Sequence, residues 1–202
     1  MRKMYLSAPL PFVGQKRMLA KEFMKVLEQY PDGTLFVDLF GGSGLLSHIT
    51  KSLKPHSTVI YNDFDNYRFR MKHIPQTNQL LADIREMVGN SVPRHKIIKG
   101  ELRERIFSRI EQEENSTGYV DFITLSSSIL FSMKYKLSVQ DMRKEALYNN
   151  IRKTGYPECT DYLEGLEIVS CDYKEVFNRY KDIPGVCLLY TSPSPRDTER
   201  SR

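Results

Sequence analysis

The turn Gly41-Gly42-Ser43-Gly44 limits the folds open to this 202-residue chain more than any other feature. Before it, Thr34 to Phe40 is apolar on both faces, as a buried parallel strand is. After it, apolar residues keep helical spacing from Leu45 to Leu53, Lys54-Pro55 stops the helix, and Thr58 to Tyr61 is expected as a second strand. Strand, turn, helix and strand form a βαβ unit, so the sequence predicts an α/β fold with a mostly parallel, doubly wound sheet.

The remaining residues are expected to extend this unit and to interrupt it once. An amphipathic helix is predicted from Lys16 to Tyr30, because its apolar residues recur at helical spacing. Residues 73–160 are highly charged and helical in pattern, which predicts an inserted lobe with helices near 80–88, 101–114 and 122–131 and a fourth helix capped by Ser138. Strands are expected again at Leu166–Cys171 and Val186–Tyr190, with a short helix between them. The predicted parts are therefore 1–72, the lobe 73–160, and a return to the sheet at 161–186.

Composition bounds the environment of the chain. Hydrophobic residues make up 40% of it, enough for a substantial core, and charges of both signs are mixed along it, unlike in a disordered tail. The formal net charge of +5 fits a polyanionic partner such as nucleic acid. Three cysteines without a C-x-x-C pair and four scattered histidines indicate neither a disulfide framework nor a metal site. Since no signal-peptide or membrane-spanning pattern is found, we expect a soluble, cytoplasmic monomer that contacts no membrane.

Acidic residues flank the glycine turn and its helix. Asp38 precedes the turn, and Asp63 follows the second strand, where a carboxylate can hold two ribose hydroxyls. A dinucleotide fold would have glycine where Ser47 stands, and a phosphate-binding loop would need Gly-Lys-Ser/Thr, so neither pattern is present. A carboxylate at Asp38 suits the ammonium group of a methionine moiety better than it suits a phosphate. We therefore expect S-adenosylmethionine as the cofactor, against the alternative that the glycines only form a tight turn.

The chain resembles the DNA adenine methylases of the Dam type over residues 9–72 and, more loosely, over 160–190. Pro11 to Lys16 is similar to the opening motif of that family, although Gln15 replaces a small residue; the likeness implies that Phe12 packs on the cofactor and that Lys16 meets its carboxylate. Asp172-Tyr173 is similar to the pair that binds and packs beside the adenine of the cofactor, with a plain helix cap as the alternative for the acid. The residues expected to bind the cofactor are Phe12, Lys16, Asp38, Phe40, Gly41, Gly42, Gly44, Asp63, Asp172 and Tyr173.

The same likeness makes the lobe 73–160 a target-recognition domain and double-stranded DNA its partner. The side chains expected to bind DNA are Lys134, Lys136, Arg143, Lys144, Arg152 and Lys153. Tyr135, Tyr148 and Tyr156 lie among them and are expected to read bases or stack on them. A solvated helix face is the alternative explanation of these charges.

The resemblance implies methyl transfer to adenine N6 in DNA without a metal, through a late Asp-Pro-Pro-Tyr motif that grips a flipped-out base. Where that motif should begin, the chain reads Thr191-Ser192-Pro193, and residues 187–197 resemble a translated sequencing adapter. We therefore assign no catalytic residue, and we expect residues 187–202 to be a non-native tail on a fragment that lacks activity. Methylation of cytosine N4 or of an RNA base, and a non-catalytic S-adenosylmethionine-binding module, are the alternatives.

Overall fold

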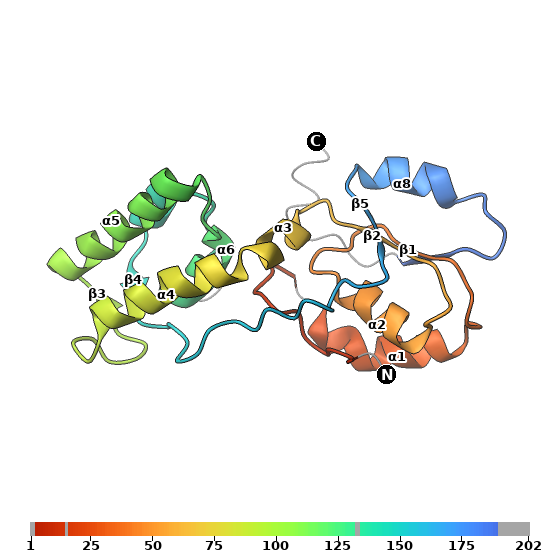
Figure 1. Cartoon of the computed structure of the whole chain (residues 1–202), viewed down its shortest axis with the longest axis horizontal. Coiled ribbons are helices and arrows are strands. Elements are labelled where there is room, and N and C mark those ends of the chain that lie inside the picture. Colours follow the sequence, from red (N-terminus) through yellow and green to blue (C-terminus); the bar gives the residue numbers. More distant parts are fainter. Residues whose placement is uncertain (1–2, 15, 132–133, 190–202) are drawn as a thin grey trace. The chain divides into compact units, whose positions relative to one another are not determined.

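A computed structural model describes residues 3–14, 16–131 and 134–189 of the chain. These residues divide into two compact units, one within Met1–Phe69 and Cys159–Arg202 and the other within Arg70–Glu158. Figure 1 labels most of their helices and strands along the chain. Gln15, and the part of the adapter-like run from Tyr190 onward, lie outside the described residues.

The first unit is built on a four-stranded parallel sheet with the strand order β5-β2-β1-β6. The strands are β1 (Phe36–Asp38), β2 (Val59–Asn62), β5 (Glu167–Val169) and β6 (Cys187–Leu189). All four strands expected from the sequence are present, and the α/β fold with a parallel sheet is confirmed. Each is only three or four residues long, and β6, which also falls within the expected tail, pairs with β1.

Helices cover both faces of this sheet, because alternate residues of a strand point to opposite sides. Phe36 packs in one apolar cluster with α1 (Ala20–Glu28) and α2 (Leu45–Leu53). Its neighbour Val37 packs in another with Val176 of α8 (Tyr173–Tyr180). The helix predicted from Lys16 to Tyr30 is observed as α1 with a 3-10 turn, η1 (Arg17–Leu19), before it.

The order of the strands determines where this unit can bind a ligand. The chain passes from β1 to β2 on one side and later places β6 on the other side of β1. Open α/β sheets bind ligands at such a reversal, outside the carboxyl ends of the strands. The glycine turn follows β1, and Asn62 ends β2, so both lie at this edge.

The second unit is mainly helical. It contains α4 (Ile74–Val88), α5 (Gly100–Thr117), α6 (Phe122–Ile129) and α7 (Val139–Arg143), and the boundary between the units falls within α3 (Tyr67–Lys72). Ser138 caps α7 as predicted, because its hydroxyl accepts the Asp141 amide at 3.2 Å. The antiparallel pair of β3 (Ile97–Ile98) and β4 (Leu147–Tyr148) is not predicted, since two-residue strands leave no periodic pattern. No helix in the described ranges is both long and apolar enough to cross a bilayer.

A buried ion pair joins two helices of the second unit. The side chains of Arg70 and Asp121 are 7% and 1% exposed, and Nη2 of the arginine lies 3.1 Å from Oδ2 of the aspartate. Asp121 also caps α6 by accepting the Thr124 amide at 3.1 Å. One carboxylate therefore orders both the start of α6 and the side chain of Arg70.

Candidate functional site

The glycine turn adopts backbone angles that side chains disfavour. Gly42 and Gly44 have φ of 51° and 70°, in the left-handed region where glycine is unstrained. The Gly44 amide donates to the Gly41 carbonyl at 2.8 Å, and Gly44 is the N-cap of α2. The turn therefore leads the chain from β1 directly into α2 at the edge of the sheet.

The ring of Tyr61 packs against this turn and explains two of its glycines. A Cβ at Gly41 would overlap the ring and lie 2.8 Å from the carbonyl oxygen of Asn62, and a Cβ at Gly44 would lie 3.3 Å from the ring. Close packing thus accounts for Gly41, and at Gly44 the left-handed backbone and the Leu163 side chain, 2.9 Å from such a Cβ, act together with the ring. Gly41 and Gly42 also border the two pockets at this edge.

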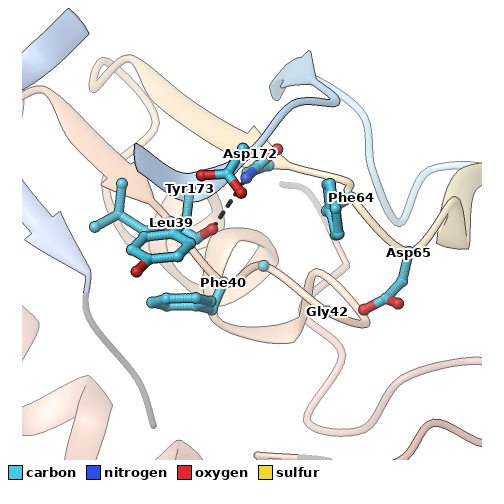
Figure 2. A pocket seen from close by; sticks show the side chains of 9 residues that line it. Leu39, Phe40, Gly42, Phe64, Asp65, Asp172 and Tyr173 are labelled. Atoms are coloured by element: carbon cyan, nitrogen blue, oxygen red, sulfur yellow. Dashed lines mark hydrogen bonds between the residues drawn. The ribbon is translucent and has the colours of Figure 1, made fainter. Parts of the chain in front are cut away.

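The two pockets adjoin one another and share Phe40, Gly41 and Gly42. The first is bordered in addition by Leu39, Asn62, Phe64, Asp65, Asp172 and Tyr173. Figure 2 shows Phe40 and Tyr173 side by side, with Phe64 apart from them on the other side of the pocket. The ring centroids of Phe40 and Tyr173 are 4.9 Å apart. Aromatic rings with carboxylates beside them suit a flat ligand with polar edges, such as adenine.

The second pocket contains a buried acid. It is bordered in addition by Phe12, Gly14, Lys16, Asp38, Ser43, Leu45 and Leu46. Asp38 is 1% exposed, and the Ser47 hydroxyl donates to its Oδ2 at 2.7 Å. Burial raises the pKa of Asp38 to about 6, although Ser47, Lys16 and the Phe40 amide act in the opposite direction. In the part of the chain that the structure describes, Oδ1 of Asp38 meets no donor in hydrogen-bond geometry, so this pocket offers a cationic group a buried carboxylate oxygen.

Residues near the start of the chain form the opposite wall of the second pocket. Phe12 packs edge-on against Tyr67, with ring centroids 5.8 Å apart, and its ring lies 3.0 Å from where a Cβ of Gly42 would be. Lys16 Nζ donates to the Gly14 carbonyl at 3.2 Å. The pocket thus combines an apolar ring, an ammonium group and a carboxylate, which is the set that an amino-acid zwitterion requires.

The end of β2 carries two acids with different surroundings. Asp63 accepts the amides of Tyr67 and Arg68 at 2.6 and 2.9 Å and so caps α3, while burial raises its pKa against these hydrogen bonds. It is not among the described residues that border the pockets, whereas Asp65 borders the first pocket. Asp63 stays a prediction, and the acid that borders the first pocket lies two residues after it.

Asp172 caps a helix and borders the first pocket at the same time. Its carboxylate accepts the Lys174 amide at 2.8 Å at the start of α8. The pocket residues that were not predicted to bind the cofactor are Leu39, Asn62, Phe64 and Asp65 in the first pocket and Gly14, Ser43, Leu45 and Leu46 in the second. Asn62, Phe64 and Asp65 lie within two residues of the predicted acid, so the end of the second strand as a whole could have identified them. The sequence pattern does not distinguish the leucines from core residues.

Most of the side chains expected to bind DNA are paired with acids inside the second unit. Acidic oxygens lie within 3.1 Å of Lys134 and Lys136 (both Glu145), Arg143 (Glu104 and Glu111) and Lys144 (Asp141). Four of the six side chains therefore form ion pairs within this unit, and two of these, Lys134 and Lys136, lie outside its helices. Lys153 is exposed.

Tyr156, which the sequence predicts to read bases or stack on them, is buried within the second unit. The residue is 7% exposed, and the guanidinium of Arg152 lies over its ring, 4.4 Å from the centroid. Tyr135 and Tyr148 are partly exposed.

Comparison with known proteins places the chain in a family. A family model described as D12 class N6 adenine-specific DNA methyltransferase matches residues 12–156, a range that begins at Phe12 and includes the glycine turn. The chain is also 39% identical over 196 residues to a protein of Haemophilus influenzae described as "Putative methyltransferase". That match covers 95% of this chain, which spans 65% of the length of the relative. The chain belongs to the D12 class N6 adenine-specific DNA methyltransferase family.

Proposed function

We propose that the first unit binds S-adenosylmethionine and that the enzyme transfers the methyl group to N6 of adenine in double-stranded DNA. The observation that carries this proposal is Asp38, a buried carboxylate beside Lys16 in the second pocket, with one oxygen that meets no donor among the described residues. From the order of the residues alone, Asp38 was expected to bind an ammonium group, and its buried carboxylate supports this role.

The charges around the two pockets suit this cofactor. Among the described residues that border them, Asp38, Asp65 and Asp172 are acidic and Lys16 is basic. S-adenosylmethionine carries a sulfonium and an ammonium group against one carboxylate, so its net charge is positive and is attracted to this set. A dinucleotide or a nucleoside triphosphate carries several negative charges and would be repelled.

In the second pocket, the side chains hold the amino-acid end of the cofactor. Asp38 accepts a hydrogen bond from the ammonium group, and Lys16 donates one to the carboxylate. Phe12 and the glycine turn exclude water on either side. A charged hydrogen bond in such a shielded place contributes more than one in water, which makes these contacts the main source of affinity.

In the first pocket, the side chains hold the nucleoside. Phe40, Phe64 and Tyr173 pack on the adenine, and Asp172 accepts a hydrogen bond from its amine. Asp65, in place of Asp63, holds the ribose hydroxyls, since both oxygens of Asp63 already accept amides of α3. The cofactor supplies a methyl group on a sulfonium, and the protein contributes by aligning it with the base and keeping water away.

Isothermal titration calorimetry of the 202-residue chain with S-adenosylmethionine tests this assignment. Asp38→Asn should weaken binding roughly tenfold to a hundredfold, the loss of one charged hydrogen bond. Asp65→Asn should weaken it more than Asp63→Asn does. Asp182→Asn is the matched control, because that acid is exposed after α8, and it should bind as the wild type does. A wild-type chain without affinity would refute the cofactor, and equal affinity in Asp38→Asn would remove that acid from the site.

The target base is tested on DNA. Because the relative is longer than this chain, the experiment uses a gene product that contains the chain together with the further segment that the relative has. Nucleoside mass spectrometry of duplex DNA incubated with it and with S-adenosylmethionine should detect N6-methyladenine. Detection of N4-methylcytosine in place of N6-methyladenine would refute adenine in DNA as the substrate.

A further inference from the structure

Three tyrosines of the first unit are fully buried, and the hydroxyl of each contacts the main chain next to the proposed cofactor pockets. Tyr61, Tyr67 and Tyr162 are each 0% exposed. A buried tyrosine hydroxyl needs a hydrogen-bond partner, and each of these has a backbone carbonyl. None of the three is among the described residues that border the pockets, so each acts on the site through another residue.

Two of the hydroxyls hold the glycine turn. Tyr61 Oη lies 2.7 Å from the Gly42 carbonyl oxygen and 3.1 Å from Oδ1 of Asp63, so its single hydrogen can serve either acceptor. Tyr162 Oη donates to the Ser43 carbonyl at 3.1 Å. The Ser43 carbonyl is therefore held by Tyr162, and the Gly42 carbonyl shares the hydroxyl hydrogen of Tyr61 with Asp63.

His48 holds Tyr162 in place. The two rings stack, with centroids 4.7 Å apart and planes 12° apart, and Nδ1 of His48 lies 2.7 Å from the Tyr162 carbonyl oxygen. That carbonyl can only accept, and the Tyr5 amide, 2.9 Å from Nε2, can only donate, which assigns the ring proton to Nδ1. Tyr162 is thereby anchored to α2, the helix that begins at the turn.

The third hydroxyl holds the wall that carries Phe12. Tyr67 Oη accepts the Leu10 amide at 2.9 Å and donates to the Leu10 carbonyl at 3.2 Å. Pro9 and Pro11 restrict the backbone on either side of that residue. Phe12 packs on the same tyrosine ring and borders the second pocket, so Tyr67 determines where this wall lies.

We propose that Tyr61, Tyr67 and Tyr162 are positioning residues for S-adenosylmethionine, because their hydroxyls keep the glycine turn and the Phe12 wall in binding geometry. This inference rests on the proposed function of the first unit. Phenylalanine at these positions would keep the packing of each ring but would leave a carbonyl without its donor. The affected segment would then adopt the binding geometry for a smaller fraction of the time, and the apparent affinity for S-adenosylmethionine would fall in proportion to that fraction.

The test compares Tyr61→Phe, Tyr67→Phe and Tyr162→Phe in the 202-residue chain by hydrogen exchange and calorimetry. Without cofactor, Tyr67→Phe should speed exchange in residues 10–14, and the other two variants should speed it in residues 41–44. The Kd for S-adenosylmethionine should rise about tenfold in each variant, the factor that corresponds to one net hydrogen bond.

Ser128→Ala is the matched control for loss of a buried hydroxyl. Ser128 is 2% exposed, and its hydroxyl donates to the Thr124 carbonyl at 2.9 Å within α6 of the second unit, none of whose described residues borders either pocket. This variant should leave the Kd for S-adenosylmethionine and the exchange of residues 10–14 and 41–44 unchanged.

Equal exchange changes throughout the unit, an unchanged Kd in the phenylalanine variants, or the same rise in Kd for Ser128→Ala would overturn the positioning role. A wild-type chain that binds no S-adenosylmethionine would refute the proposed function instead. In that case the segment-specific exchange would still decide whether the hydroxyls hold these two walls.

Discussion

Replacing Asp38 by asparagine removes a buried charge and keeps the shape of the side chain. The carboxyl is 1% exposed, and burial raises its pKa from the ordinary 3.8 to about 6. An acid whose pKa is higher in the folded chain holds its proton more tightly there, so its ionisation disfavours folding. The difference between 3.8 and about 6 corresponds to roughly 3 kcal/mol. This cost is absent below about pH 4, grows as the pH rises, and is complete above about pH 6.

Urea denaturation of the wild type and of Asp38→Asn at pH 7.5 and pH 4.5 measures this cost. At pH 7.5 the variant should be more stable by about 1–3 kcal/mol, where the lower end allows for an amide NH₂ that is buried without a good acceptor. At pH 4.5 most of the advantage should disappear. Ser47→Ala is the control with the opposite sign, because it removes the hydroxyl that stabilises the carboxylate and should lower stability at pH 7.5.

An Asp38→Asn chain that is no more stable than the wild type at pH 7.5 would refute this reasoning, since ionisation of Asp38 would then not destabilise the folded chain. The expected pair of results is a variant that is more stable and binds the cofactor less tightly. A residue that lowers stability while it improves ligand binding is typical of a functional site, where strain and buried charge are retained for the ligand.

Three further changes test other contacts of the structure. Gly41→Ala should destabilise the chain by about 1–3 kcal/mol, because its Cβ would overlap the Tyr61 ring, and an unchanged Tm in thermal denaturation would contradict that packing. Asp121→Ala should cost about 3–5 kcal/mol in urea denaturation, since it leaves the buried Arg70 guanidinium without its carboxylate; a loss below about 1 kcal/mol would show that the pair is dispensable. Glu145→Gln should tighten binding to duplex DNA and steepen its dependence on salt, because it releases two lysines, and fluorescence anisotropy that shows the same affinity would remove those lysines from the DNA surface.

The sheet could be predicted because its signals are local. Apolar residues on both faces before the turn, and helical spacing after it, follow from contacts within a few residues, and the observed β1, α2 and β2 lie where they predict. The observed strands are shorter than the apolar runs, since a run records burial and a strand also requires a paired neighbour. The strands β3 and β4 pair through only two residues each, which is too few to produce a periodic pattern of apolar residues in the sequence.

The choice between two acids at the end of β2 could not be predicted in the same way. Asp63 and Asp65 are two residues apart and have the same chemistry. They differ because α3 begins at Tyr67, which brings the first amides of that helix to Asp63 and leaves Asp65 at the pocket. The six residues of α3 carry too short a periodic signal to place its start, so the sequence alone gave no reason to expect Asp65, and not Asp63, beside the pocket.

The walls of the pockets depend on partners even farther apart in the chain. The hydroxyls of Tyr61, Tyr67 and Tyr162 contact carbonyls that are 19, 57 and 119 residues away. In the sequence each of these tyrosines is equivalent to any core aromatic residue, because periodicity identifies a buried ring and says nothing about the partner of its hydroxyl. Burying a hydroxyl is unfavourable unless it is hydrogen-bonded. Phenylalanine would therefore fill the core equally well if only the volume of the side chain mattered. Three buried hydroxyls that contact two neighbouring segments therefore indicate that the main chain of these segments has to be held in place. The position of this main chain determines the geometry of the two pockets.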